Sequence, residues 1–385
     1  MTQPPLQPQA QPGTPDLLYS DVEDDLRSAV RGLLADHCPP TAVLARIESD
    51  TPYDLDLWRT LAAEVGLAGL LVPEELGGHG GSAREAAVVL EELGATVAPV
   101  PFLGSAVLAT SALLAVPGTA GPLLKRLASG EATAALAVPL PTAPGADFPH
   151  GVRADADGVL SGRVTSVADA SAADVLVVPA AGPGGPGLYE IAADAPGVRI
   201  TVPVALDLTR PIADVTFDAA AARLLAGPDT ATAALHRALL TGAGLLASEQ
   251  LGIAQWCLDE TVRYLNERHQ FGRPVGSFQS LKHRLADIWL EVVSARAAAR
   301  NAADALASGS PDAAVAVAVA QAHCATTAVH AAEECIQLHG GIGMTWEHPA
   351  HLYLKRAKAD EIALGTPGHH RAALAELVDL PAVSG

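Results

Sequence analysis

Apolar side chains recur every three or four residues along the first third of the chain, from about residue 16 to residue 130. This spacing places them on one face of an α-helix, so the pattern predicts a helical N-terminal domain at 16–130. Pro and Gly residues between 73 and 81 predict a loop between two of its helices. Residues 1–15 are rich in Pro and Gln, and we expect them to form a disordered tail.

The pattern changes at about residue 131, where the helical spacing ends and short β-prone runs begin. Clusters of Gly and Pro, such as the one at 182–187, separate these runs. Several short strands at such spacing predict a small β-barrel or sandwich at 131–229. The runs occupy residues 158–161, 174–178, 197–202 and 213–217.

Long helical segments return from residue 230 to residue 385. They cover 234–267, 281–308 and 311–338, and the last two are divided at Gly309. Helices of this length pack antiparallel in a bundle. The expected fold is therefore an α+β multidomain protein with an N-terminal helical domain, a middle β domain and a C-terminal long-helix bundle.

Charge and cysteine content narrow the function classes. The 385 residues carry a formal net charge of −19, which argues against nucleic acid or an anionic membrane as a partner. The chain shows neither a signal peptide nor a convincing membrane span. Its four cysteines lie far apart and form no CxxC pair. We therefore expect buried thiols in a cytoplasmic protein, with neither disulfides nor a cysteine zinc site.

Four local motifs follow one another along the chain. LAAEVGLAGLLVPEELGG occupies 61–78, EELG occupies 91–94, RHQFGRPVG occupies 268–276 and QLHGGIGM occupies 337–344. Together with the helical, β and helical layout, they resemble the acyl-CoA dehydrogenase superfamily over nearly the whole chain after the tail. The resemblance implies an oxidoreductase that uses FAD to dehydrogenate an acyl-CoA thioester between its α- and β-carbons.

The last two motifs carry the expected cofactor contacts. In the family they hold the adenosine half of an FAD whose flavin ring lies mainly in the neighbouring subunit. An arginine such as Arg268 suits a pyrophosphate because its planar guanidinium donates paired hydrogen bonds. Gln279 fits a cofactor contact and the wet face of a helix equally well. The expected cofactor-binding residues are Arg268, Gln270, Phe271, Gln279, Gln337, Gly340, Gly341 and Thr366.

The catalytic base of the family has no counterpart at either of its known positions. The usual glutamate belongs to a segment that reads IALGT here at 362–366, and Leu364 stands in its place. Some members carry the base in the long helix before the RHQFG motif, and that position falls at about Gly242. Neither leucine nor glycine has a side chain that accepts a proton, so we expect no catalytic residue in this chain. Glu249 is the nearest carboxylate on that helix.

The segments that contact the flavin ring in the family are also altered. The stretch 134–144 reads AALAVPLPTAP and lacks the family's glutamate, and TSVAD at 165–169 replaces a Trp-Ile-Thr-like strand. Ser166 thus stands for the aromatic ring, and Ala168 stands for the threonine that bonds flavin N5. Asp360 and Glu361 could act as displaced bases, but we expect them to be solvated helix carboxylates.

These losses predict a division of labour between subunits. The motifs that would act on a partner's flavin are retained, whereas those that would hold this chain's own flavin are eroded. We expect one subunit of a mixed complex, with two copies of each chain, whose partner is a related subunit with an intact base. The resemblance also implies electron-transfer flavoprotein as electron acceptor. The alternatives are a flavin-free dehydratase or lyase that uses His369 or Glu249, and a purely structural paralogue.

The C-terminal region is rich in histidine. Its members are His339, His348, His351, His369 and His370. No HxxxH-type pair with a further acidic ligand stands out, so we expect no metal site. His369 and His370 follow Thr366 closely and are expected to line the mouth of the former active site. The basic strip of Lys355, Arg356 and Lys358 contacts a partner or balances local acids.

Overall fold

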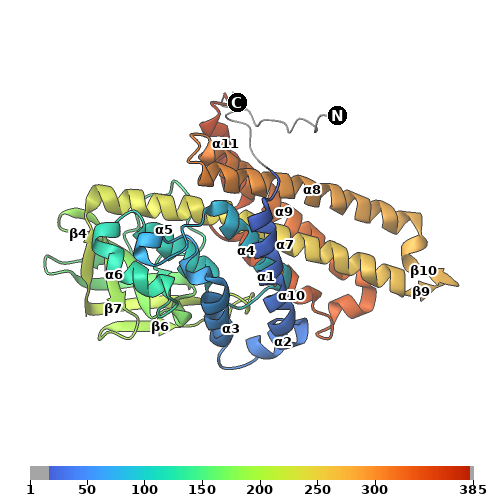
Figure 1. Ribbon diagram of the computed structural model, residues 1–385, viewed down its shortest axis with the longest axis horizontal. Coiled ribbons are helices and arrows are strands. Elements are labelled where there is room, and N and C mark those ends of the chain that lie inside the picture. The colour runs from blue at the N-terminus through green and yellow to red at the C-terminus, as the bar shows by residue number, and fades with distance from the viewer. Residues whose placement is uncertain (1–16, 382–385) are drawn as a thin grey trace, which may run out of the picture.

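A computed structural model gives the fold and describes residues 17–381, so the expected tail at 1–15 lies outside the described residues. The N-terminal region is helical, as the spacing of apolar residues predicts (Figure 1). Its α-helices are α1 (Asp21–His37), α2 (Pro40–Ile47), α3 (Leu55–Thr60), α4 (Ala83–Thr96), α5 (Thr110–Leu113) and α6 (Pro117–Ala128). The π-helical stretches η1 (Leu61–Val65) and η4 (Phe102–Ala109) and the short 3-10 turns η2 (Leu67–Gly69) and η3 (Glu74–Leu76) join them.

Local polar residues fix where two of these helices begin. Ser20 and Glu23 form a capping box before α1, and Ser82 and Glu85 form another before α4. Each box satisfies backbone N–H groups that have no partner inside the helix. Capping therefore sets the start of each helix, and the apolar face sets its packing.

The middle region forms one eight-stranded sheet. Its spatial order is β6-β7-β3-β2-β4-β5-β8, and β1 pairs in parallel with β4. Most neighbours are antiparallel, as short strands joined by tight turns predict. The strands are β1 (Ala134–Leu136), β2 (Val152–Ala154), β3 (Val159–Ala168), β4 (Val175–Gly182), β5 (Gly185–Ala192), β6 (Val198–Thr201), β7 (Ile212–Ala221) and β8 (Arg223–Ala226).

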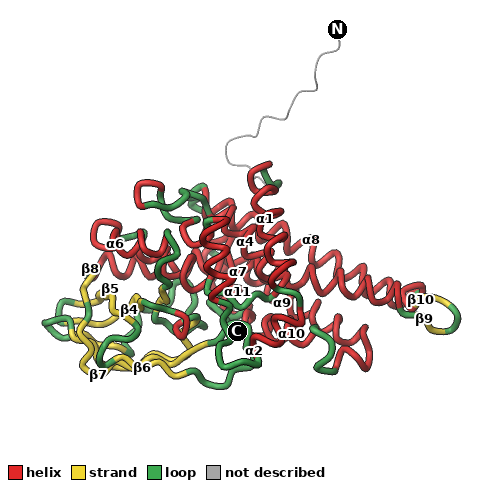
Figure 2. Tube along the Cα trace, turned by 60° about the horizontal axis from the view of Figure 1, so that its bottom comes forward, coloured by secondary structure: helices red, strands yellow, loops and turns green. Residues whose placement is uncertain are grey.

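Long helices form the C-terminal region. Figure 1 shows α7 running from beside the strands into the bundle, and Figure 2 shows the hairpin of β9 and β10 at the far end of that bundle. The elements are α7 (Pro228–Glu267), β9 (His269–Gln270), β10 (Arg273–Pro274), η6 (Val275–Ser277), α8 (Gln279–Ala307), α9 (Ala313–His339), η7 (Gly340–Met344), α10 (Ala350–Ile362) and α11 (Pro367–Leu377). The expected α+β architecture is confirmed.

One helical stretch of the described chain, Ala313–Met344, is long and apolar enough to cross a membrane by length and composition alone. Within the fold, α9 packs against α7, α8, α10 and α11, so its apolar surface contributes to the bundle core. All four cysteines are buried and unpaired, which confirms the expectation of packed thiols.

Candidate functional site

Five of the eight expected cofactor-binding residues line one cleft of about 640 Å³. The cleft lies between the end of α7, the β9–β10 hairpin, the start of α8 and the junction of α9 with η7. The five residues are Arg268, Gln270, Gln337, Gly340 and Gly341. Folding thus brings together two motifs that are far apart in the sequence.

The backbone holds Arg268 at the rim of this cleft. The residue follows α7 directly in an extended conformation, and its N–H donates to Tyr264 O at 2.8 Å. Its carbonyl accepts from Val275 N at 2.7 Å. Its side chain is exposed and has no ion-pair partner among residues 17–381, whereas Arg284 of the same cleft pairs with Glu334. Arg268 is therefore a cation available to an anionic ligand.

The two glycines keep the opposite wall open. Gly340 ends α9 with a φ of 63°, a left-handed conformation that favours glycine. A Cβ added to Gly340 or Gly341 would meet nothing within 4 Å, so the backbone faces free space. An open backbone beside an unpaired guanidinium fits the diphosphate and adenosine half of FAD.

The other three expected residues do not line this cleft. Phe271 lies at the tip of the hairpin with 90% of its surface exposed, and Gln279 is the exposed first residue of α8. Thr366 caps α11, where its hydroxyl accepts from His369 N at 3.2 Å. Thr366 therefore lies outside this cleft, at the start of α11.

The two base positions meet at one point in the fold, and leucine side chains fill it. A Cβ added to Gly242 would lie 3.1 Å from Leu364 Cδ1 and 2.4 Å from Leu108 Cδ2. Leu364 itself is fully buried. The two expected base positions thus form a packed apolar contact.

The altered flavin-ring segments also converge there. Leu140 N donates to Ser166 O at 2.9 Å, and Leu364 N donates to Leu140 O at 2.7 Å. Beside them lies a pocket of about 200 Å³, with Leu140, Ser166 and Ile362 in its wall. Ala168 is buried and its methyl group offers no hydrogen bond. The structure therefore places all three altered segments around one small, mainly apolar space.

The expectation that Asp360 is solvated is wrong. Its side chain is fully buried and pairs with Arg210 Nη1 at 2.7 Å. Glu249 is also buried, and it pairs with Arg210 and with Arg356, the latter at 2.6 Å. Arg356 reaches Asp207 at 2.7 Å as well. Arg356 of the basic strip on α10 therefore belongs to an interior charge network and does not face a partner.

Charges in this network set the protonation of its carboxyl groups. Burial alone would raise the pKa of Glu249, but Arg210 and Arg356 outweigh burial and hold that pKa below its ordinary value. Burial raises the pKa of Asp360 well above its ordinary value, and the charge of Glu249 raises it further. Because Asp207, Glu249 and Asp360 outnumber the two arginines, one proton on Asp360 neutralises the network.

The two adjacent histidines lie beside a cavity of about 720 Å³. His370 is buried and its Nε2 lies 3.0 Å from Leu364 O, while His369 is exposed. Burial lowers the pKa of His370. His369 is therefore the more available of the two for proton transfer.

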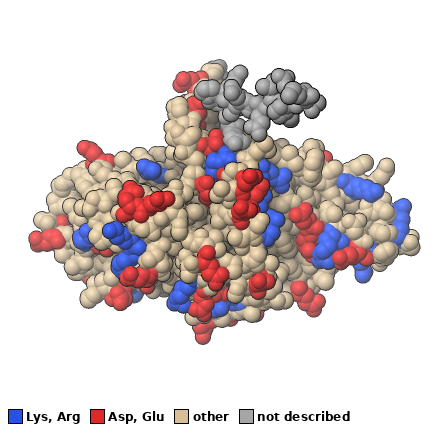
Figure 3. All heavy atoms as spheres, in the orientation of Figure 1, with Lys and Arg blue, Asp and Glu red and all other residues tan. Residues whose placement is uncertain are grey.

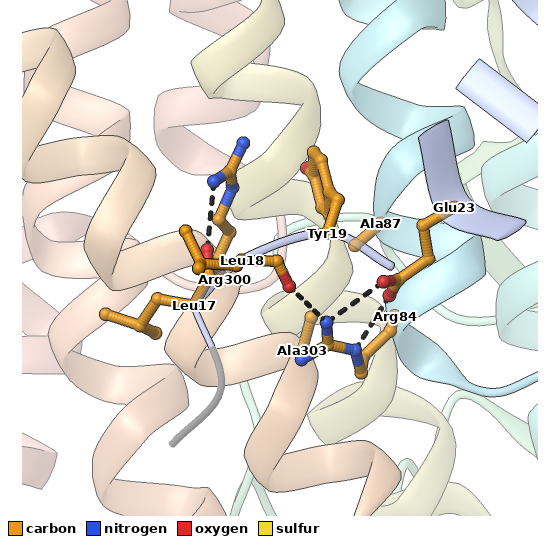
Figure 4. Close-up of a pocket in the computed structure, with 8 residues that line it drawn as sticks. All are labelled: Leu17, Leu18, Tyr19, Glu23, Arg84, Ala87, Arg300 and Ala303. Carbon is orange, nitrogen blue, oxygen red and sulfur yellow. Dashed lines mark hydrogen bonds and ion pairs between the residues drawn. The ribbon is translucent and has the colours of Figure 1, made fainter. Parts of the chain in front are cut away.

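A further cavity lies beside residues 17–19, where side chains from α4 and α8 hold the N-terminal segment in place (Figure 4). Arg84 donates to Leu18 O at 2.6 Å and to Glu23 Oε1 at 2.7 Å, and Arg300 donates to Leu17 O at 2.9 Å. Its volume of about 10 Å³ is at the limit for a single water molecule. The segment is thus fastened across α4 and α8, and no room remains for a ligand.

Comparison with known proteins establishes the family. Residues 20–131 match the model for the acyl-CoA dehydrogenase N-terminal domain, and residues 231–378 match that for the C-terminal domain. The acyl-CoA dehydrogenase IpdE2 of Mycobacterium tuberculosis is 39% identical over 89% of this chain and 92% of its own length. The chain therefore belongs to the acyl-CoA dehydrogenase family, whose members are flavoprotein oxidoreductases.

Solved structures agree with this assignment. The chain is similar to the structure titled Tcur3481-Tcur3483 steroid ACAD G363A variant, with a TM-score of 0.83, 33% identity and coverage of 94% of this chain and 99% of that chain. It is also similar to the ChsE4-ChsE5 complex from Mycobacterium tuberculosis, with a TM-score of 0.83, 30% identity and coverage of 95% and 100%. The chain also shares its fold with butyryl-CoA dehydrogenase from Megasphaera elsdenii, with a TM-score of 0.84. The two are 23% identical, and the match covers 94% of this chain and 99% of that chain.

Proposed function

We propose that this chain is one subunit of a mixed acyl-CoA dehydrogenase and that it completes the FAD site of a related subunit that carries the catalytic base. One contrast carries the proposal. The adenosine-side cleft is open and lined by the unpaired Arg268, whereas Leu364 and Leu108 fill the space at Gly242 where a base would act. A chain of this kind can hold a cofactor but cannot remove the substrate's α-proton.

Each retained group has a definite task in this proposal. Arg268 binds the pyrophosphate, the backbone of Gly340 and Gly341 approaches the phosphates, and Gln337 and Gln270 orient the adenosine half. FAD, when bound, supplies the acceptor for the hydride that leaves the β-carbon. Gln279 and Phe271 are exposed beside the cleft and would meet the partner's side of the cofactor.

The comparisons support a mixed assembly and a first substrate class. The Tcur3481-Tcur3483 and ChsE4-ChsE5 structures each combine two proteins, and the first is a steroid enzyme. We therefore take steroid-derived acyl-CoA thioesters as the first class to assay. A cytoplasmic location and electron-transfer flavoprotein as acceptor complete the proposal.

An exposed apolar stripe on α8 offers a surface for the partner. Trp289 and Leu290 are more than half exposed, and Val293 follows one turn later at 38% exposure. Contiguous apolar groups of this kind mark protein contacts. The face in Figure 3 shows acidic and basic groups interspersed, with no large patch of either sign. Apolar packing rather than charge would then join the chains, in two copies of each.

Anaerobic mixing with acyl-CoA tests the proposal. The chain is incubated with excess FAD and mixed with steroid-derived and straight-chain acyl-CoA thioesters, first alone and then with the related chain. We expect no bleaching of flavin absorbance by the chain alone and bleaching by the complex. Bleaching by the chain alone would show that it contains a working base.

The same assay run without FAD tests a flavin-free lyase, the alternative that the cavity beside His369 favours. Glu249 cannot serve in such a reaction because both its oxygens are held by buried arginines. His369 is the remaining candidate. Hydrated or dehydrated thioester formed without FAD, and lost in His369→Gln, would favour the lyase.

A further inference from the structure

Three side chains from separate parts of the sequence meet beside the cofactor cleft. Glu260 comes from α7, His339 is the last residue of α9, and His348 precedes α10. One ligand atom of each lies within 4.8 Å of the others. Glu260 Oε1 is 3.4 Å from His348 Nε2 and 4.0 Å from His339 Nε2.

His339 presents a buried nitrogen that has no hydrogen-bond partner among the described residues. Its Nδ1 lies 2.6 Å from Cys335 O. A carbonyl oxygen can only accept, so Nδ1 carries the hydrogen, and Nε2 of the neutral ring has a bare lone pair. The residue is 2% exposed, and Nε2 has no hydrogen bond within the described chain. Leaving such an atom unpaired costs about 1–3 kcal/mol, so we expect a group that binds this lone pair.

We propose that Glu260, His339 and His348 bind a Zn²⁺ ion. Two imidazole nitrogens and one carboxylate oxygen are a donor set that zinc favours, and a fourth tetrahedral position remains for water. Ligands bound at about 2.0–2.2 Å from a tetrahedral ion lie roughly 3.3 Å apart, so small side-chain rotations close the observed distances. The bond from His339 Nδ1 to a backbone carbonyl is the outer contact that orients histidine ligands.

Existing contacts of His348 and of both Glu260 oxygens change when the ion binds. Ala350 N donates to His348 Nδ1 at 3.2 Å, so in the empty site Nε2 of the neutral ring carries the hydrogen and donates to Glu260. Ligation moves that proton to Nδ1, and the Ala350 N–H, a first-turn helix donor, loses this acceptor. Arg263 releases Glu260 but keeps Glu267, which lies 2.6 Å away.

The ion would tie together the elements that shape the cleft. His339 lines the cleft and directly precedes Gly340 and Gly341. Fixing His339 to α7 and to the segment before α10 holds the glycine turn between them. The sequence gives no hint of this cluster, because its members are separated by long helices and form no recognised spacing motif.

Zinc titration of the full chain tests the proposal. The purified chain is stripped with a chelator, dialysed and titrated with ZnCl₂ against a chromophoric chelator, with metal counted by mass spectrometry. We expect one zinc per chain and at least ~10-fold weaker binding in His348→Gln and in Glu260→Gln. Glu260 is partly exposed, so its neutral isostere retains the fold, which circular dichroism verifies.

His330→Gln is the matched control. His330 forms a surface pair with Glu291 at 2.8 Å, and among the described residues it belongs to no group of three possible metal ligands. Zinc binding should be unchanged in this variant. The proposal is overturned if the wild-type chain retains no zinc, or if His348→Gln and Glu260→Gln bind it as the wild-type chain does. Loss of zinc in Cys335→Ser with retention in His348→Gln would place the ion at the buried thiols and would equally overturn it.

Discussion

At the scale of single residues, Arg268 represents the part of the site that is retained, and Leu364 represents the part that is lost. Among residues 17–381 no carboxylate pairs with Arg268, so its charge is available to a phosphate. Leu364, at the expected position of the base, is fully buried and lies with Leu108 beside Gly242. Each residue predicts a different consequence of substitution.

Replacing the arginine should weaken cofactor binding. A charge-assisted hydrogen bond contributes about 1.5–3 kcal/mol, so Arg268→Gln should weaken FAD binding by the complex roughly 10- to 100-fold. Fluorescence titration of the apo-complex measures this. Arg273→Gln is the control, because Arg273 stacks on Phe278 at 3.9 Å in the same hairpin and does not line the cleft. Equal losses in both variants would contradict the role given to Arg268.

Leu364 should matter for stability and not for chemistry. Leu364→Met conserves volume and should leave dehydrogenation by the complex unchanged. Leu364→Ala opens a cavity in the packed contact and should lower the free energy of unfolding by about 2–5 kcal/mol. Urea unfolding and turnover by the complex separate the two effects. Loss of turnover in the folded Leu364→Met complex would show that this residue reaches the reaction.

At the scale of elements, α10 joins α7 to the loop before β7 through buried charges. Glu249→Gln removes one charge from this network and should cost about 3–5 kcal/mol of stability at neutral pH. The wild-type contribution of Glu249 is present above its ordinary pKa of 4.5 and is lost as pH falls through the lowered pKa of the folded state. As pH is lowered through this range, the free energy of unfolding of the variant should therefore fall less steeply than that of the wild-type chain.

Asp360 should have the opposite pH dependence. Its pKa in the folded chain lies well above its ordinary value of 3.8. Its contribution to stability is thus complete below 3.8 and is lost as pH rises through the raised pKa. Asp360→Asn cannot titrate, so its stability should decline less than that of the wild-type chain over this window. Thermal unfolding at a series of pH values measures both variants, and a decline as steep as that of the wild-type chain would contradict a protonated Asp360.

The same elements show what the sequence could and could not predict. Long helices and short strands follow from the spacing of apolar residues, since burial of one face requires that spacing. The inward direction of Arg356 and Asp360 does not follow, because charged residues on a helix normally face water. Their partners Asp207 and Arg210 lie in a distant loop, and nothing local marks the pairing.

At the scale of the whole molecule, four motifs were enough to predict the family and the meeting of Arg268 with Gly340 and Gly341. They could not predict that Gly242 and Leu364 share one packed contact, since side-chain packing across α7 and the end of α10 has no sequence pattern. The apolar stripe on α8 and the exposed hairpin leave the described chain with surface suited to a partner.

The FAD content of the purified chain, alone and with its related subunit, tests the central claim most directly. Visible absorbance and released FAD are measured against protein concentration in both samples. We expect a colourless chain alone and about one FAD for each pair of chains in the complex. A yellow chain that holds its own full complement of FAD without a partner would contradict the account.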